Sequence, residues 1–244
     1  MTMAPKANHV WTLRIAGATI AMAVLVLLAG PLMAWGLIGW QAGLGMFVIA
    51  ALLAGLGGIF CLIAIVRKRG NLGVIVAAAA GIAALAIPAA IILEGRKVPP
   101  INDISTDTAN PPAFEAITAD MRGRGSAPLL YDPGFAAIQA KGYPGLTGKN
   151  LPVAPAAAFA AALAAAKAQG WTIVASDAAA GRIEATDTVP WWGFKDDVVI
   201  RLTPDGTSGS GGTRVDVRSK SRVGKGDLGV NAQRISDFLE ALKA

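Results

Sequence analysis

A long stretch without charge limits what the first part of this chain can be. No charged side chain occurs between Ile15 and Val66, a run of 52 residues, and none occurs between Gly70 and Leu93. A helix needs about 20 apolar residues to cross a bilayer, so the first run fits two spans joined by a turn near residues 36–45. The sequence therefore predicts a membrane region at 1–96 with three transmembrane helices, at about 15–36, 44–66 and 72–93.

Positive charges beside these runs predict their orientation. Arg67–Arg69 fill the short loop between the second and third spans, and Lys6 and Arg14 precede the first. Loops rich in Lys and Arg stay in the cytoplasm, so both signals place the N-terminus inside and the C-terminus outside, although the basic pair 96–97 at the exit runs against this. We expect a multi-pass membrane protein, with the lipid bilayer as a partner and a C-terminal domain outside the cytoplasm.

Two alternatives concern the spans themselves. The first segment could be a cleaved signal peptide, but its apolar core is too long and no small-x-small cleavage site precedes polar sequence.

Only Thr19 and Gln41 interrupt the apolar runs, whereas transporters place ionisable groups there. Small residues four apart, such as Ala54 and Gly58, permit close helix packing. We interpret the spans as an anchor, with partner recognition through these faces as the alternative.

The net charge of +6 does not indicate a nucleic-acid-binding protein. Residues 1–98 hold seven Lys or Arg and one acid, so the whole excess lies beside the membrane, and the remainder is neutral. A domain that binds nucleic acid usually carries a positive excess of its own.

Beyond the membrane the pattern predicts an α+β two-layer domain at 113–244, after a Pro-rich linker or lead-in at 97–112. A short helix is expected near Phe135–Ala140. A longer helix should start at Pro155 and stop at Gly170, and another should follow Asp227 as its cap. Short hairpin connections, including one over 205–212, make the sheet antiparallel. We expect four strands with helices on one face, at Trp171–Ser176, Arg182–Val189, Asp197–Thr203 and Thr213–Ser219.

The sequence offers little for catalysis. His9 is the only histidine and Cys61 the only cysteine, which excludes Ser-His-Asp, Cys-His and zinc sites from the domain. We expect no cofactor and no metal site, although carboxylate catalysis or calcium binding stays formally open. Asp196 and Asp197 are neighbours in a strand and should point to opposite faces, so they do not form a dyad. The G-x-G-x-x-G of 224–229 lies too close to the C-terminus for a dinucleotide fold.

Two groups of residues are candidates for binding. Trp191 and Trp192, close to Phe194, could be core, line an apolar pocket or face lipid. Polar residues at a strand end and the following helix start suit an anion, because guanidinium groups and the helix dipole both favour negative charge. The alternative is an ion-pair network of these arginines with Asp197, Asp216 and Asp227. The candidate polar site comprises Arg218, Ser219, Ser221, Arg222, Asp227, Asn231 and Arg234, with Asp196 and Asp197 as secondary candidates.

The same stretches resemble a known family. Phe194-Lys-Asp-Asp-Val-Val-Ile-Arg201, the run Val215–Ile235 and the lead-in Pro100–Phe114 are similar to the bacterial domain-of-unknown-function family DUF1499, in its membrane-anchored type. The resemblance covers about 100–244 and implies no established activity. It implies a protein of the bacterial inner membrane whose C-terminal domain lies in the periplasm. Other members carry a Cys-containing lead-in that this chain lacks. The motif positions it implies are Asp196, Asp197, Arg218, Ser219, Ser221, Arg222, Gly224, Asp227, Gly229, Asn231 and Arg234.

Two functions follow as hypotheses. The first is a membrane-anchored binding or assembly module of the cell envelope, which recognises a lipid headgroup or an acidic membrane or envelope protein. The alternative is an envelope enzyme that acts on lipid or glycan through carboxylates.

Overall fold

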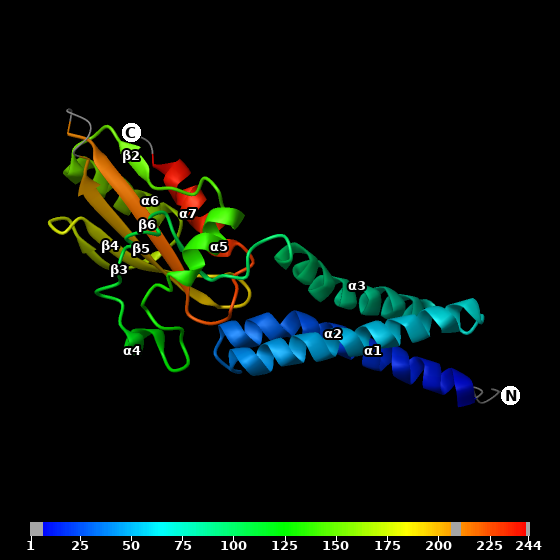
Figure 1. The fold of residues 1–244 in the computed structure, drawn as a ribbon. Coiled ribbons are helices and arrows are strands. Elements are labelled where there is room, and N and C mark those ends of the chain that lie inside the picture. The colour runs from blue at the N-terminus through cyan, green and yellow to red at the C-terminus, as the bar shows by residue number, and fades with distance from the viewer. Residues whose placement is uncertain (1–6, 206–210, 243–244) are drawn as a thin grey trace. The chain divides into compact units, whose positions relative to one another are not determined.

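The computed structural model describes residues 7–205 and 211–242 (Figure 1). It divides into two compact units. One comprises Met1–Glu94 with Pro190–Gly193, and the other comprises Gly95–Val189 with Phe194–Ala244. Residues 206–210 of the expected hairpin loop lie outside the described residues.

Three long apolar helices form the first unit. They are α1 (Ala7–Ala34), α2 (Trp40–Val66) and α3 (Leu72–Gly95), and each is long and apolar enough to cross a membrane. Glycines let α2 and α3 approach closely: a Cβ on Gly81 would collide with the carbonyl oxygen of Ala54 and come within 2.8 Å of the Gly58 Cα. The small residues noted in the sequence therefore lie at a helix contact, as such residues do in membranes.

The second unit contains a six-stranded antiparallel sheet, not the four-stranded sheet expected. Its strand order is β1-β6-β5-β4-β3, and β2 also pairs with β6. β1 lies opposite Arg218–Lys220 and β2 opposite Thr213–Val215, so the two short strands share one edge of β6. Three residues are too few for an alternating pattern to show, which is why both strands escaped detection. The strands are β1 (Asp103–Ser105), β2 (Lys149–Leu151), β3 (Thr172–Asp177), β4 (Arg182–Thr188), β5 (Lys195–Pro204) and β6 (Thr213–Ser221).

The segment 97–112, expected as a linker, belongs to this sheet. It contains β1, and every residue from Ile101 to Thr106 is buried. The prolines around it removed the local strand signal, because proline is depleted in strands.

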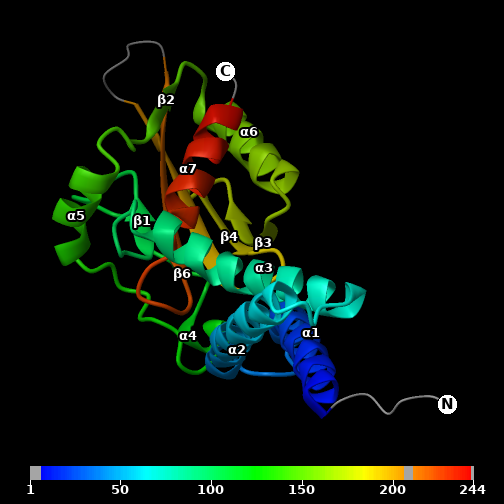
Figure 2. The same ribbon diagram turned by 90° about the vertical axis from the view of Figure 1, so that its right-hand side faces the viewer.

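Four helices complete the second unit: α4 (Ala119–Arg122), α5 (Gly134–Gly142), α6 (Pro155–Ala168) and α7 (Val230–Ala241). The short helix expected near Phe135–Ala140 lies within α5. α6 begins with Pro155 in its first turn and is followed by Gly170 at φ +80°, as the sequence predicted. Figure 2 shows α6 and α7 side by side.

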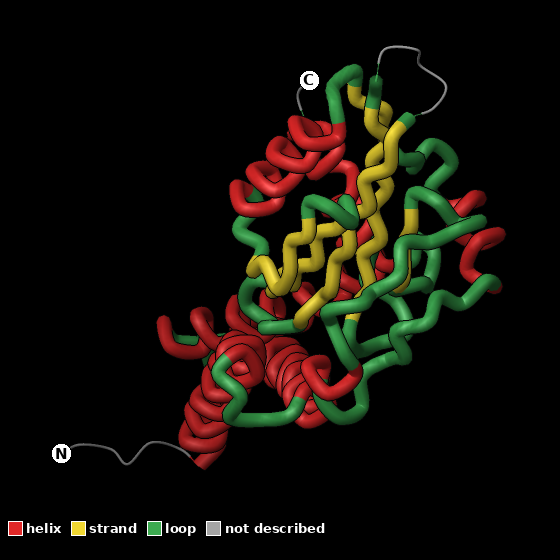
Figure 3. The backbone as a smooth tube through the Cα atoms, turned by 90° about the vertical axis from the view of Figure 1, so that its left-hand side faces the viewer, coloured by secondary structure: helices red, strands yellow, loops and turns green. Residues whose placement is uncertain are grey.

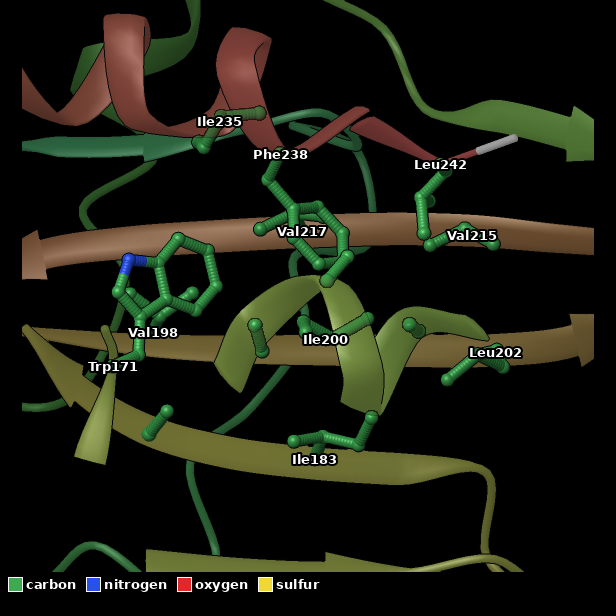
Figure 4. Close-up of a cluster of buried hydrophobic side chains, with 14 of the residues drawn as sticks. Trp171, Ile183, Val198, Ile200, Leu202, Val215, Val217, Ile235, Phe238 and Leu242 are labelled. Carbon is green, nitrogen blue, oxygen red and sulfur yellow. The ribbon is translucent and has the colours of Figure 1, made fainter. Parts of the chain in front are cut away.

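The hydrophobic core lies between α6, α7 and one face of the sheet, called here the aliphatic face (Figure 4). Trp171 stacks on Phe238 of α7 with ring centroids 5.3 Å apart. The strands contribute alternate residues, since successive side chains point to opposite faces. The aliphatic face comprises Ile183, Ala185, Val198, Ile200, Leu202, Val215 and Val217, all buried.

The opposite face of the sheet is also buried, but it carries charged side chains. We call it the charged face; it carries Glu184, Asp197, Asp216, Arg218 and Lys220. Residues 106–131, called the loop cover, run over it, and Figure 3 shows loops crossing the strands. The polar residues of the sequence prediction are therefore divided between the two sides of one sheet.

Candidate functional site

Strand alternation separates the predicted polar site into two clusters. On the aliphatic side, at one end of the core, Ser219 and Ser221 of β6 meet Asn231 and Arg234 of α7. Arg218 and Arg222 lie on the charged face instead. The sequence placed all of these residues in one site, because the strand end and the helix start are adjacent in the chain.

The cluster beside α7 is a closed set of hydrogen bonds. Ser219 Oγ donates to Asn231 Oδ1 at 2.6 Å, and Asn231 Nδ2 donates to Ser221 Oγ at 2.9 Å. Arg234 donates to Asn231 Oδ1 at 2.6 Å, and its guanidinium also contacts two aspartates. The two carboxylate contacts are Nη2 to Asp196 at 2.7 Å and Nε to Asp187 at 2.8 Å.

The N-cap of α7 is Gly229, not Asp227 as the sequence predicted, and Asp227 lies two residues before it. Its carboxylate accepts the backbone N–H of Gly229 at 2.9 Å and that of Asn231 at 3.0 Å. Burial raises the pKa of Asp227, and these two backbone hydrogen bonds partly offset the rise. With Asp187 and Asp196 nearby on Arg234, the cluster holds more carboxylates than guanidinium groups. Its charge does not favour the anion that the sequence suggested for this helix terminus.

On the charged face, Asp103 of β1 holds two cations. Arg218 donates to its carboxylate through Nε and Nη2, both at 2.8 Å, and Lys220 Nζ lies 2.6 Å away. The Arg218 guanidinium also lies over the rings of Phe114 and Tyr131, at 5.1 and 5.4 Å. Burial lowers the pKa of Lys220, and it raises the pKa of Tyr131 to about 12 with the help of Asp103.

Asp197 forms the second such group. It accepts from Arg122 Nε, Arg222 Nη2 and Thr186 Oγ1, each at 2.8 Å. Arg122 comes from α4 in the loop cover, and burial lowers its pKa although Asp197 acts in the opposite direction. Asp196 thus meets Arg234 on one side of the sheet while Asp197 meets Arg122 and Arg222 on the other, as strand alternation requires.

Glu184 fixes the loop cover without a cation. Its fully buried carboxylate accepts the backbone N–H groups of Glu115, Ala116 and Ile117 at 2.7 to 2.9 Å. Three such bonds satisfy a buried carboxylate, which would otherwise be costly.

Sequence reasoning missed several members of these clusters. Asp103 was hidden in the supposed linker, and Arg122 in a segment without clear periodicity. Two had a usable signal: Lys220 continues the alternation of Asp216 and Arg218, and Glu184 alternates with Ile183 and Ala185. The loop cover buries these charged side chains of the strands.

The aromatic pair Trp191 and Trp192 belongs to the first, helical unit. Trp192 and Trp191 lie edge-on to Phe47 of α2, with centroids 5.1 and 6.1 Å apart. A Cβ on Gly30 of α1 would come within 2.5 Å of the Trp191 ring, so the packing is tight. These contacts are typical of aromatic packing.

A groove of about 530 Å³ lies elsewhere in the second unit. It is open to solvent and largely apolar, and Gln233 and Ser236 supply polar atoms. The Tyr143 hydroxyl is buried and makes no hydrogen bond to the described residues, and burial raises the pKa of Tyr143. The main apolar walls are Val98, Tyr143, Leu146, Leu228, Val230 and Ala232.

Within residues 7–205 and 211–242, no group of three or more His, Cys, Asp and Glu side chains is arranged to hold a metal ion.

The family comparison confirms the resemblance seen in the sequence. The profile of DUF1499, described as a protein of unknown function, matches residues 103–242, more than half of the chain. The chain belongs to the DUF1499 family. No curated protein matches it. In this DUF1499 protein, the buried clusters around Asp103, Asp197 and Arg234 all lie within the matched region.

Proposed function

We propose that this DUF1499 protein is a membrane-anchored binding or assembly module of the cell envelope, with its domain on the periplasmic side of the inner membrane. The observation that carries the proposal is that the arginines of the family motif form ion pairs within the domain. Arg218 is bound to Asp103, Arg222 to Asp197 and Arg234 to Asp196, all inside the domain. These ion pairs hold a defined surface, and the three helices keep that surface at a bilayer.

The same pairing argues against the enzymatic alternative. Asp103 and Asp197 each contact two cations, so their carboxylate oxygens are already occupied by partners within the domain. A general base needs access to the proton it removes, and these carboxylates are fully buried. Recognition of a lipid headgroup or an acidic partner requires only the surface.

Topology is tested with reporter fusions. Alkaline phosphatase fused after Ala244 should be active. The basic loop Arg67–Arg69 stays in the cytoplasm, and α3 then carries the chain across the membrane. A fusion at Gly70 is the matched control and should be inactive. The reverse pair of results would overturn the periplasmic placement.

Binding is tested by purifying the full chain in mild detergent and identifying everything bound by mass spectrometry. We expect a co-purified phospholipid or an acidic envelope protein. Turnover of a lipid or glycan that a single Asp substitution abolishes would favour the enzyme instead.

A further inference from the structure

We propose that the groove lined by Val98, Tyr143, Leu146, Leu228, Val230 and Ala232 takes an acyl chain of an anionic phospholipid from the surrounding leaflet. This inference rests on the proposed function, since it names the ligand and the place of binding. The volume of about 530 Å³ lies within the range of small-molecule sites, and the walls match the chemistry of a hydrocarbon chain.

The groove lies close in the chain to the last membrane-spanning helix. Val98, one of its walls, follows Gly95, the last residue of α3, by three positions. Three residues span at most about 11 Å. Leu228 on the opposite wall also approaches this point, because a Cβ on Gly95 would lie 2.6 Å from Leu228 Cδ2. A lipid beside the end of α3 is therefore a suitable occupant of the groove.

Exposed basic residues adjoin the groove walls in the chain. Arg96, Lys97 and Lys225 are exposed near the walls in the chain, while the lining itself carries no charged side chain. Basic residues next to a transmembrane helix attract anionic lipids. The buried Tyr143 hydroxyl, which has no partner among the described residues, would find an acceptor in an ester carbonyl of the lipid.

The conformation and exposure of Leu228 support a binding role for the groove. Leu228 has a φ of +58° and its side chain is 55% exposed. The left-handed region disfavours leucine. Strain of this kind persists at sites of function. In this conformation Leu228, which lines the groove, offers an apolar contact to the acyl chain of the lipid.

The test uses the full chain in vesicles that contain phosphatidylglycerol with a diazirine in its acyl chain. After irradiation, trypsin cuts after Lys225 and Arg234, so the groove wall is recovered as peptide 226–234. We expect this peptide to be labelled, and labelling to fall at least fivefold in Leu228→Asn. Asparagine tolerates a positive φ, so the melting temperature of Leu228→Asn should equal or exceed that of the wild type.

Leu130→Asn is the matched control, because Leu130 is 83% exposed and lies outside the groove. It should leave labelling of 226–234 unchanged. Labelling that survives Leu228→Asn, or equal labelling by a phosphatidylcholine probe, would overturn the inference; so would a lowered melting temperature in Leu228→Asn, which indicates a packing role.

The two proposals fail separately. If an acidic protein co-purifies while 226–234 stays unlabelled, only the groove inference fails. If neither lipid nor protein binds the domain, both fail.

Discussion

The two faces of the β-sheet are buried by different means. The aliphatic face is covered by α6 and α7, and its residues gain stability in proportion to the apolar area removed from water. The charged face is covered by loop, and its buried charges gain from pairing roughly what they lose in desolvation. Apolar burial therefore stabilises this fold, whereas the ion pairs determine which loop conformation covers the second face.

The aliphatic face and the charged face differ in how well they tolerate substitutions. An aliphatic core accepts another apolar residue of similar volume at small cost. A buried ion pair that loses one partner leaves the other charge uncompensated, which costs several kcal/mol. The comparison predicts that single substitutions on the charged face are at least as harmful as those on the aliphatic face. Four predictions test this in the fragment 95–244, in order of decreasing effect.

The largest effect should come from Asp103→Ala. It leaves both Arg218 and Lys220 buried without their carboxylate, at a cost of about 3–5 kcal/mol in the free energy of unfolding. Urea denaturation measures this directly. Asp120→Ala, which removes an exposed carboxylate from α4, is the control and should stay within about 0.5 kcal/mol. Equal effects of the two substitutions would mean that leaving Arg218 and Lys220 without their carboxylate carries no penalty in stability.

A truncation in the aliphatic face should cost slightly less. Ile200→Ala removes a fully buried side chain beneath the helices, and we expect about 3 kcal/mol by the same measurement. Ile200→Val keeps most of the volume and should cost about 0.5–1.5 kcal/mol. A cost for Ile200→Ala well above that for Asp103→Ala would reverse the comparison.

Arg222 and Arg214 offer a pair within the charged face. Arg222 donates to Asp197 with a side chain that is 14% exposed, so Arg222→Ala should cost about 1.5–3 kcal/mol. Arg214 contacts Asp216 but its side chain is 34% exposed, and Arg214→Ala should cost at most about 1 kcal/mol. Thermal melts of both variants, together with Arg234→Ala, decide the role of these arginines. Little loss of stability combined with loss of binding would restore the anion-site hypothesis.

The smallest effect should be a pH dependence at Asp227. Burial raises the folded-state pKa of Asp227 above its ordinary value of 3.8, so the folded protein keeps this proton at a pH where the unfolded chain has lost it. The resulting stabilisation is present below pH 3.8 and is lost as the pH rises through the raised pKa. Asp227→Asn cannot titrate. The stability of the wild type relative to Asp227→Asn should therefore fall over this window, and melts between pH 3 and pH 7 would show it. A constant difference would contradict the raised pKa.

Local patterns determined much of this protein from its sequence. Charge-free runs longer than a bilayer crossing gave the three helices, because water and lipid separate charged from apolar residues over about 20 positions. Proline and glycine at the ends of α6, and the alternation of Val198, Ile200 and Leu202, likewise act within a few residues. Family motifs could be recognised in the chain for the same reason: they are contiguous.

Only the tertiary structure decided how the charges pair. Asp103 and Arg218 are 115 positions apart, and Arg122 and Asp197 are 75 apart. Nothing local distinguishes a strand arginine that faces water from one that faces a carboxylate beneath a loop. That choice depends on β1 joining the edge of β6 and on Glu184 binding the backbone of residues 115–117, which places the loop cover over the sheet. Periodicity fixes which face a side chain takes, but its partner is set by the packing of distant segments, because ion pairing acts through space rather than along the chain.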